Sequence, residues 1–198
     1  GPIDGHNIKA MEKALKQAQK ASRSVVIHMQ TIKGKGYKYS EEDHLGIWHG
    51  VPPFDKDTGI FKCNQATCWS QAIANDLDEI LAKNEKTVLI NPAMVQGSCL
   101  NEVFKKYKDR TFDVGICEEH AFTMASGLAL SGYHPIISIY STFMQRAYDE
   151  IQQDLARMNL NVTITIDRAG LVGADGETHQ GIFDEAMLYT IPNTIITM

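Results

Sequence analysis

The sequence predicts an α/β fold, a three-layer αβα sandwich with a mainly parallel sheet, preceded by a helix–strand segment and a linker. Beyond about residue 60, short apolar runs alternate with longer segments whose apolar residues recur at helical spacing. Such alternation is typical of parallel strands that helices cover on both faces through right-handed connections. The polar motifs follow the expected strand ends, where open α/β sheets bind their ligands.

Residues 1–60 are expected to form the first domain. Asp4 can cap a helix that ends near residue 22, and the β-branched run over residues 24–31 predicts a strand. Residues 37–62 scatter charges, glycines and prolines without a sustained period, which is typical of a linker. A domain boundary near residue 60 follows from this change in composition.

Residues 61–198 are expected to form the second domain, in which strands and helices alternate. No helix follows its last expected strand, so the sheet looks incomplete at the C-terminal end. The strands are predicted at residues 87–90, around 112, and at 134–140, 162–167 and 194–198, and the helices at 67–83, 100–107, 118–132, 144–158 and 183–188.

The composition argues against several classes of protein. The net charge is −5 and the basic stretches are short, so a nucleic-acid partner is not expected. No apolar run approaches the roughly 18 residues of a membrane helix. The cysteines form no CxxC pair and no zinc-finger spacing, which predicts reduced thiols, a cytoplasmic location and no metal site within the chain: Cys63, Cys68, Cys99 and Cys117.

The segment 112–120, Phe-Asp-Val-Gly-Ile-Cys-Glu-Glu-His, is the stretch around which the rest is organised. A short apolar run breaks at Gly115 and leaves Glu118 in the first turn of a helix. The exposed amides and the macrodipole favour a carboxylate there, so Glu118 is either an ordinary helix-stabilising residue or a catalytic acid. His120 is expected to be structural.

Three further motifs follow other expected strand ends: residues 140–149, 167–170 and 173–181. Because the carboxyl ends of parallel strands share one edge of the sheet, we expect their side chains to converge on one rim with Glu118. The residues concerned are Tyr140, Phe143 and Arg146 from the first motif, Arg168 from the second, and Asp175 and His179 from the third.

Taken together and in this order, the four motifs resemble the pyrimidine-binding module of thiamine-diphosphate enzymes in the transketolase superfamily. Within it they are most similar to the 1-deoxy-D-xylulose-5-phosphate synthase family. Residues 1–6 resemble the sequence shortly before the end of that family's diphosphate-binding module, so the resemblance spans the chain. It implies a fragment: the end of the diphosphate-binding module with its linker, and most of the pyrimidine-binding module.

The resemblance implies roles for the residues that bind the cofactor. Glu118 would hydrogen-bond N1′ of the aminopyrimidine and favour the tautomer that removes the C2 proton of the thiazolium ring. Phe143 would stack on the pyrimidine, which fixes the plane of the ring, although plain packing is the alternative. Tyr140 would contact both the cofactor and the substrate.

Other residues are implied to act on the substrate. His179 and Asp175 would face it, and His49 would enter the site from the first module as a further catalytic histidine. Arg168 suits the phosphate of a sugar-phosphate acceptor, because its guanidinium group forms two charge-assisted hydrogen bonds. Arg146 would bind substrate or, equally well, pair with an acidic residue of its own helix, Asp149 or Glu150.

The implied reaction condenses pyruvate with D-glyceraldehyde 3-phosphate, with loss of CO₂, in a homodimer that uses thiamine diphosphate and Mg²⁺. The Gly-Asp-Gly motif and the asparagine that hold the metal and diphosphate in the family do not occur here. The fragment alone is therefore expected to bind the cofactor weakly and to lack turnover. The alternatives are ketol transfer of the transketolase type and a non-catalytic pyrimidine-binding or oligomerisation module.

Overall fold

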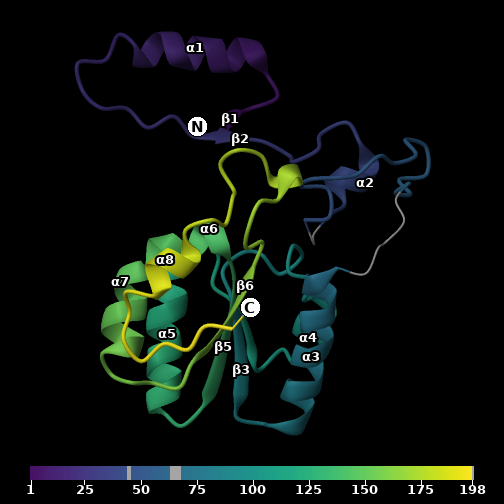
Figure 1. The fold of residues 1–198 in the computed structure, drawn as a ribbon. Coiled ribbons are helices and arrows are strands. Elements are labelled where there is room, and N and C mark those ends of the chain that lie inside the picture. The colour runs from purple at the N-terminus through teal and green to yellow at the C-terminus, as the bar shows by residue number, and fades with distance from the viewer. Residues whose placement is uncertain (44–45, 63–67, 198) are drawn as a thin grey trace. The chain divides into compact units, whose positions relative to one another are not determined.

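The computed structural model describes residues 1–43, 46–62 and 68–197 (Figure 1). The chain divides into two compact units, Gly1–Gln65 and Ala66–Met198. The division lies a few residues beyond the position at which the composition changes. Among the described residues, no helix is both long enough and apolar enough to cross a membrane.

The first unit contains a small parallel ribbon and two helices. Strand β1 (Ile3–Asp4) pairs with β2 (Met29–Gln30), and α1 (Ile8–Ala18) connects them. Asn7 caps α1 by accepting a hydrogen bond from the backbone of Ala10 at 3.1 Å, so the helix begins later than predicted. The predicted strand over residues 24–31 is reduced to the two residues of β2.

The predicted linker has local structure that its composition did not indicate. Helix α2 (Lys38–Glu41) lies within it. The indole of Trp48 contacts the rings of Tyr37, Phe54 and Phe61 at centroid distances of 5.0, 4.8 and 5.3 Å. Aromatic burial of this kind stabilises a compact arrangement without a periodic pattern in the sequence, which is why the analysis of periodicity missed it.

A four-stranded sheet is the basis of the second unit, and every neighbouring pair in it is parallel. The strand order is β4-β3-β5-β6, so β3 and β5 are central and β4 and β6 form the edges. The strands are β3 (Thr87–Asn91), β4 (Thr111–Asp113), β5 (His134–Tyr140) and β6 (Thr163–Asp167).

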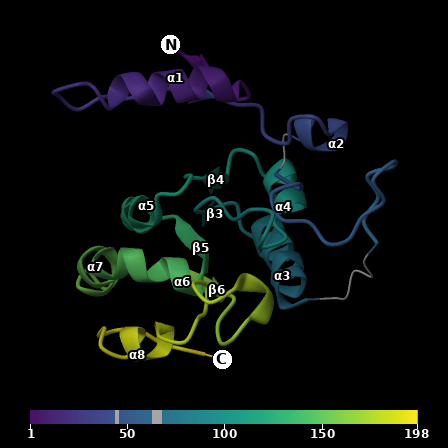
Figure 2. The same cartoon turned by 90° about the horizontal axis from the view of Figure 1, so that it is seen from above.

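Helices cover both faces of this sheet, which confirms the predicted αβα layers (Figure 2). One face carries α3 (Trp69–Lys83) and α4 (Asn101–Lys106). The other carries α5 (Glu118–Leu130), α7 (Tyr148–Glu150) with the π-helical segment Ile151–Ala156, and α8 (Asp184–Leu188). The short helix α6 (Ser141–Met144) begins where β5 ends.

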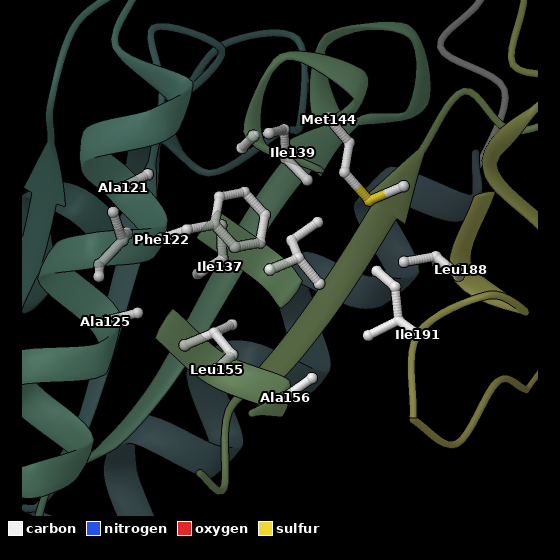
Figure 3. Close-up of a cluster of buried hydrophobic side chains, with 13 residues drawn as sticks. Ala121, Phe122, Ala125, Ile137, Ile139, Met144, Leu155, Ala156, Leu188 and Ile191 are labelled. Atoms are coloured by element: carbon white, nitrogen blue, oxygen red, sulfur yellow. The ribbon is translucent and has the colours of Figure 1, made fainter. Parts of the chain in front are cut away.

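Two apolar clusters fill the spaces between these layers. Alternation along β5 supplies both of them, because successive side chains of a strand point to opposite faces. Ile136 belongs to the cluster beneath α3 and α4, whereas Ile137 and Ile139 belong to the cluster beneath α5. Phe122 is fully buried in the second cluster, between α5 and the sheet (Figure 3).

Two predictions for the second unit were wrong. Residues 194–197 form no strand: the chain turns at Asn193, whose φ is 61°, and the side-chain Nδ2 of Asn193 donates to the carbonyl of Ala156 at 3.3 Å. Ile195 then remains exposed, so β-branched composition alone gave a misleading signal. The predicted helix 144–158 starts earlier, at Ser141, and is divided into α, 3₁₀ and π segments.

Candidate active site

The predicted site residues of the second unit lie after the carboxyl ends of three strands. Glu118 opens α5, which follows the edge strand β4. Tyr140 ends β5 and Phe143 lies in α6 directly after it. Arg168 follows β6, at the opposite edge. The order of the strands therefore spreads these side chains along one rim of the sheet.

Glu118 is a buried carboxyl group with a free acceptor position. Its side chain is only 3% exposed, because the next turn of α5 packs Ala121 and Phe122 into the core. Its Oε2 lies 3.5 Å from Nη1 of Arg146 but, among the described residues, accepts no hydrogen bond. Buried polar atoms in proteins normally have a partner, so this oxygen calls for an explanation.

Arg146 pairs with the start of α5 rather than with its own helical segment. Its guanidinium contacts Glu118 at 3.5 Å and Glu119 at 3.7 Å. In the part of the chain that the structure describes, no ion pair joins it to Asp149 or Glu150, so that alternative was wrong. Arg146 remains 52% exposed and can therefore reach a ligand in front of Glu118.

Aromatic rings meet beside these charged groups. The rings of Tyr140 and Phe143 are stacked, with centroids 5.7 Å apart and an interplanar angle of 8°. His179 contacts Phe143 edge-on at 5.3 Å. Burial raises the pKa of the Tyr140 hydroxyl, and the nearby guanidinium of Arg168 opposes that shift. The structure thus brings together three of the predicted residues.

Arg168 is already engaged by two neighbours. Its Nη1 lies 3.3 Å from Oδ1 of Asp175, and its guanidinium carbon lies 5.4 Å from the centroid of the Tyr140 ring. Its backbone adopts a φ of 60°, a left-handed conformation that is unusual for a residue other than glycine. This conformation redirects the chain at the end of β6 and places Arg168 and Asp175 in contact.

Hydrogen bonds hold the glycine-rich loop, residues 170–181, in a defined shape. Gln180 accepts from the amide of Val172 at 2.7 Å and donates to the carbonyls of Val172 and Gly176. Gly170 and Gly181 exchange backbone hydrogen bonds of 2.6 and 2.9 Å. The loop is therefore an ordered part of the rim and not only a flexible connection.

The loop also fixes the ring of His179. The hydroxyl of Thr178 and Nδ1 of His179 are 2.7 Å apart, and the hydroxyl of Thr142 donates to the carbonyl of Thr178 at 3.3 Å. The first contact restrains the orientation of the imidazole ring, whichever of the two groups donates. Thr178 thus supports a predicted site residue, and its only sequence signal was its place beside a histidine.

A hollow of about 240 Å³ lies between α6, this loop and α8. Its described lining includes Thr142, Gln145, Thr178 and Phe183. Glu118, for which we predicted a catalytic role, is not among the described lining residues of this hollow.

The sequence of the second unit matches a known family. Residues 65–198 match the model of the transketolase pyrimidine-binding domain. The chain belongs to this family. Its carboxyl-end rim, with a buried glutamate beside stacked aromatic rings, is thus the rim of a transketolase-type pyrimidine-binding domain.

Curated relatives extend the similarity over the whole chain. Proteins named 1-deoxy-D-xylulose-5-phosphate synthase from Listeria welshimeri and Lysinibacillus sphaericus are 52% and 51% identical over 200 residues, which cover 100% of this chain. The matched part is 32% of each relative. The chain therefore spans about a third of the length of the curated relatives it matches.

Solved structures agree with this assignment. One, described as a split-gene transketolase in an inactive β4 tetramer, is 30% identical with a TM-score of 0.53 and covers 62% of this chain and 40% of its own. The transketolase of Campylobacter jejuni, at 14% identity and a TM-score of 0.58, covers 93% of this chain and 25% of its own. The second likeness supports the fold alone.

His49, the remaining predicted site residue, belongs to the first unit. Nζ of Lys33 lies 3.1 Å from its Nδ1, and Trp48 beside it belongs to the aromatic cluster. Its participation in catalysis stays a prediction. No group of three or more potential metal-ligating side chains occurs among the residues that the structure describes.

Two polar residues that we did not predict form hydrogen bonds at the rim. They end strands β3 and β4. Asn91 is fully buried; it donates to the carbonyl of Ser138 at 2.9 Å and accepts from the amide of Met94 at 2.7 Å. Asp113 accepts from the amides of Ala93 and Gly115, each at 3.0 Å. Both residues could have been predicted from their positions, because each is a polar residue at the carboxyl end of an apolar strand.

Proposed function

We propose that the chain is part of a thiamine-diphosphate-dependent 1-deoxy-D-xylulose-5-phosphate synthase, in which Glu118 activates the cofactor. The whole enzyme would condense pyruvate with D-glyceraldehyde 3-phosphate, with loss of CO₂. The observation that carries the proposal is the buried side chain of Glu118, whose Oε2 accepts no hydrogen bond from any residue that the structure describes. A ring nitrogen sharing a proton with that oxygen would satisfy it.

The residues present fit an aminopyrimidine ring. Glu118 offers a carboxyl oxygen at the start of α5, and Phe143, which stacks on Tyr140, offers an aromatic surface in α6, on the same rim of the sheet. When bound, thiamine diphosphate supplies a carbon that becomes nucleophilic on losing its proton. Glu118 would hold a proton between Oε2 and the pyrimidine nitrogen, and Phe143 would fix the plane of the ring.

Other rim residues would bind and orient the substrates. Arg146, half-exposed beside Glu118, and Arg168 both present guanidinium groups that suit carboxylate and phosphate. Asp175 holds Arg168 at 3.3 Å and so orients it, while the contact between the Thr178 hydroxyl and Nδ1 of His179 would hold the imidazole ring in place for hydrogen bonding to substrate. His49 would add a second histidine from the first unit.

The diphosphate and Mg²⁺ would be held by parts of the enzyme outside this chain. Residues 1–60 would be the end of the diphosphate-binding module and its linker, and the complete enzyme would be a cytoplasmic homodimer that uses both modules. We expect the 198-residue chain alone to bind thiamine diphosphate weakly and to show no turnover, because a pyrimidine ring offers little surface to hold.

A chimera tests the proposal. The matching third of the Listeria welshimeri synthase is replaced by this chain, and product formation from pyruvate and D-glyceraldehyde 3-phosphate is measured. Glu118→Gln should lower kcat by about 10²–10⁴-fold, the range for losing a positioned acid or base. Glu119→Gln is the matched control and should cost less than about fivefold, because an exposed ion pair contributes at most about 1 kcal/mol.

The same chimera discriminates between the two enzymatic activities. Use of a ketose phosphate as donor in place of pyruvate would favour ketol transfer of the transketolase type. Full activity of the Glu118→Gln variant would refute the role of Glu118 with either donor.

A non-catalytic module is the second candidate function. It is favoured by the 30% identical structure described as an inactive β4 tetramer of a split-gene transketolase. Calorimetry of the 198-residue chain with thiamine diphosphate and Mg²⁺, together with sedimentation of the chain, addresses this candidate. Tight binding by the isolated chain would contradict our expectation that it needs the rest of the enzyme.

A further inference from the structure

Two cysteines that the sequence analysis treated as unpaired lie close together in the second unit. The Sγ atoms of Cys68 and Cys99 are 4.0 Å apart, although the residues are separated by 31 positions. Cys68 is exposed at the N-cap of α3, and Cys99 is half-buried in the turn between β3 and α4. The side chain of Cys68 makes no capping hydrogen bond with α3, so a rotation of this side chain costs no such bond.

The backbone around Cys99 is held in an unfavourable state. Its φ is 58°, in the left-handed region that residues with a Cβ rarely adopt. The hydroxyl of the preceding residue, Ser98, is buried and has no hydrogen-bond partner among the described residues. Such strain persists only where the surrounding structure enforces it, and it is found where a segment has a second arrangement.

We propose that Cys68 and Cys99 are a reversible disulfide-forming pair, oxidised by small-molecule disulfides, and that their oxidation displaces the rim beside Tyr140. A disulfide bond is about 2 Å long, so the sulfur atoms must approach each other by about 2 Å. Movement of the exposed Cys68 and of the strained turn at Cys99 supplies that approach.

The chemistry balances with an oxidised low-molecular-weight thiol such as glutathione disulfide. The thiolate of exposed Cys68 attacks one sulfur of the oxidant, forms a mixed disulfide and releases one small thiol. Burial raises the pKa of Cys99, which keeps it a thiol towards external reagents. After losing its proton to solvent, Cys99 attacks the sulfur of Cys68 and releases the second small thiol.

Two contacts connect the pair to the candidate active site. Gly97, in the same turn as Cys99, packs so closely on the Tyr140 hydroxyl that a Cβ at this position would overlap it. Ser70, in the first turn of α3 after Cys68, donates to Oδ1 of Asp167 at 3.1 Å, directly before Arg168. A shift of either cysteine therefore reaches the residues that surround Tyr140.

Thiol counting tests the pairing. After incubation with glutathione disulfide, the chain should fall from four free thiols to two, remain monomeric on a non-reducing gel, and recover on reduction. Cys68→Ser should retain its three thiols, whereas Cys99→Ser should stop at the mixed disulfide and carry one bound glutathione on Cys68. Cys63→Ser and Cys117→Ser, as matched controls, should still lose two. Loss of two thiols in Cys68→Ser, or a different cross-linked peptide, would overturn the pair.

Hydrogen exchange of the same oxidised chain tests the connection to the rim. The amides of Gly97 and Ser70 should change their exchange rates severalfold on oxidation and return on reduction, whereas Gly127 in α5 should not change. Unaltered exchange at Gly97 and Ser70 in chain that has lost two thiols would refute the displacement. Neither measurement depends on the proposed catalytic function.

The activity of the chimera then shows how the displacement of the rim affects catalysis. This experiment rests on the proposed function. Oxidation should lower its activity severalfold, and the Cys99→Ser chimera should resist the same treatment. Equal loss in the Cys99→Ser chimera would count against the pair as the cause. A chimera that is inactive when reduced would refute the proposed function and leave the thiol count unaffected.

Discussion

The start of α5 and the glycine-rich loop over residues 170–181 each bring an acidic side chain to the rim, but different forces hold them. Glu118 lies on a helix whose next turn is fully buried, at Ala121 and Phe122. Asp175 lies on a loop that is fixed by the hydrogen bonds of Gln180 and by an ion pair with Arg168. One position depends on apolar packing and the other on polar contacts near solvent.

The two regions therefore differ in mobility: Glu118 is fixed in place, whereas the loop that carries Asp175 can move. Glu118 cannot move without disturbing the core, whereas the loop can open when a few solvent-accessible hydrogen bonds break. Both carboxylates face a guanidinium group, but Oε2 of Glu118 accepts no hydrogen bond among the described residues, whereas Asp175 accepts one from Arg168. A fixed acid opposite a movable loop suits a site that must hold one ring in place and admit different substrates.

The largest expected effect comes from breaking the packing beneath Glu118. Phe122→Ala should lower the free energy of unfolding by about 3–5 kcal/mol, because it removes a fully buried aromatic side chain. Urea denaturation of the chain measures this. Leu130→Ala, on the same helix but 61% exposed, is the control and should cost less than about 1 kcal/mol. Equal costs would mean that α5 is not anchored as described.

A smaller and more local effect is expected in the loop. Gln180→Ala removes the acceptor of the Val172 amide, so exchange of that amide should accelerate by about tenfold or more, while global stability falls by only about 1 kcal/mol. Glu177→Ala, exposed on the same loop, is the control. A cooperative loss of protection throughout α5 would show that the two regions are not independent.

The smallest effect concerns Tyr140, which lies between the two regions. Burial raises its pKa in the folded chain, so the unfolded chain loses this proton first as the pH rises above about 10, and Tyr140 then contributes to alkaline unfolding. Tyr140→Phe should retain more of its neutral-pH stability there than the unaltered chain. Denaturant titrations near pH 7 and above pH 10 test this, with the exposed Tyr133→Phe as control.

The sequence was sufficient for the layers and for most of the helices and strands, because the periodic burial that defines them is local. Strand β5 alternates between two apolar clusters, and α5 buries one stripe, so both leave a clear pattern. Asn193 left no such pattern: its left-handed backbone and its bond to Ala156 draw the last described residues away from the sheet.

The contacts of the site residues were harder to predict, because they join residues far apart in the sequence. Arg146 had acidic candidates on its own helix, yet it pairs with the start of α5. The contact between Cys68 and Cys99 follows from the fold alone, since nothing in their spacing suggests a pair. Resemblance to a family identified the rim residues, but it could not show that Oε2 of Glu118 accepts no hydrogen bond among the described residues.

The order β4-β3-β5-β6 also sets the width of the opening that a ligand meets. Glu118 and Arg168 follow the two outer strands, three strand spacings apart, which is about 14 Å at roughly 4.8 Å per spacing. Backbone hydrogen bonds of the two inner strands maintain this distance, whatever side chains follow the carboxyl ends of the strands. The residues that follow the strands can therefore be replaced to suit other substrates, while the distance between the two outer strands stays constant.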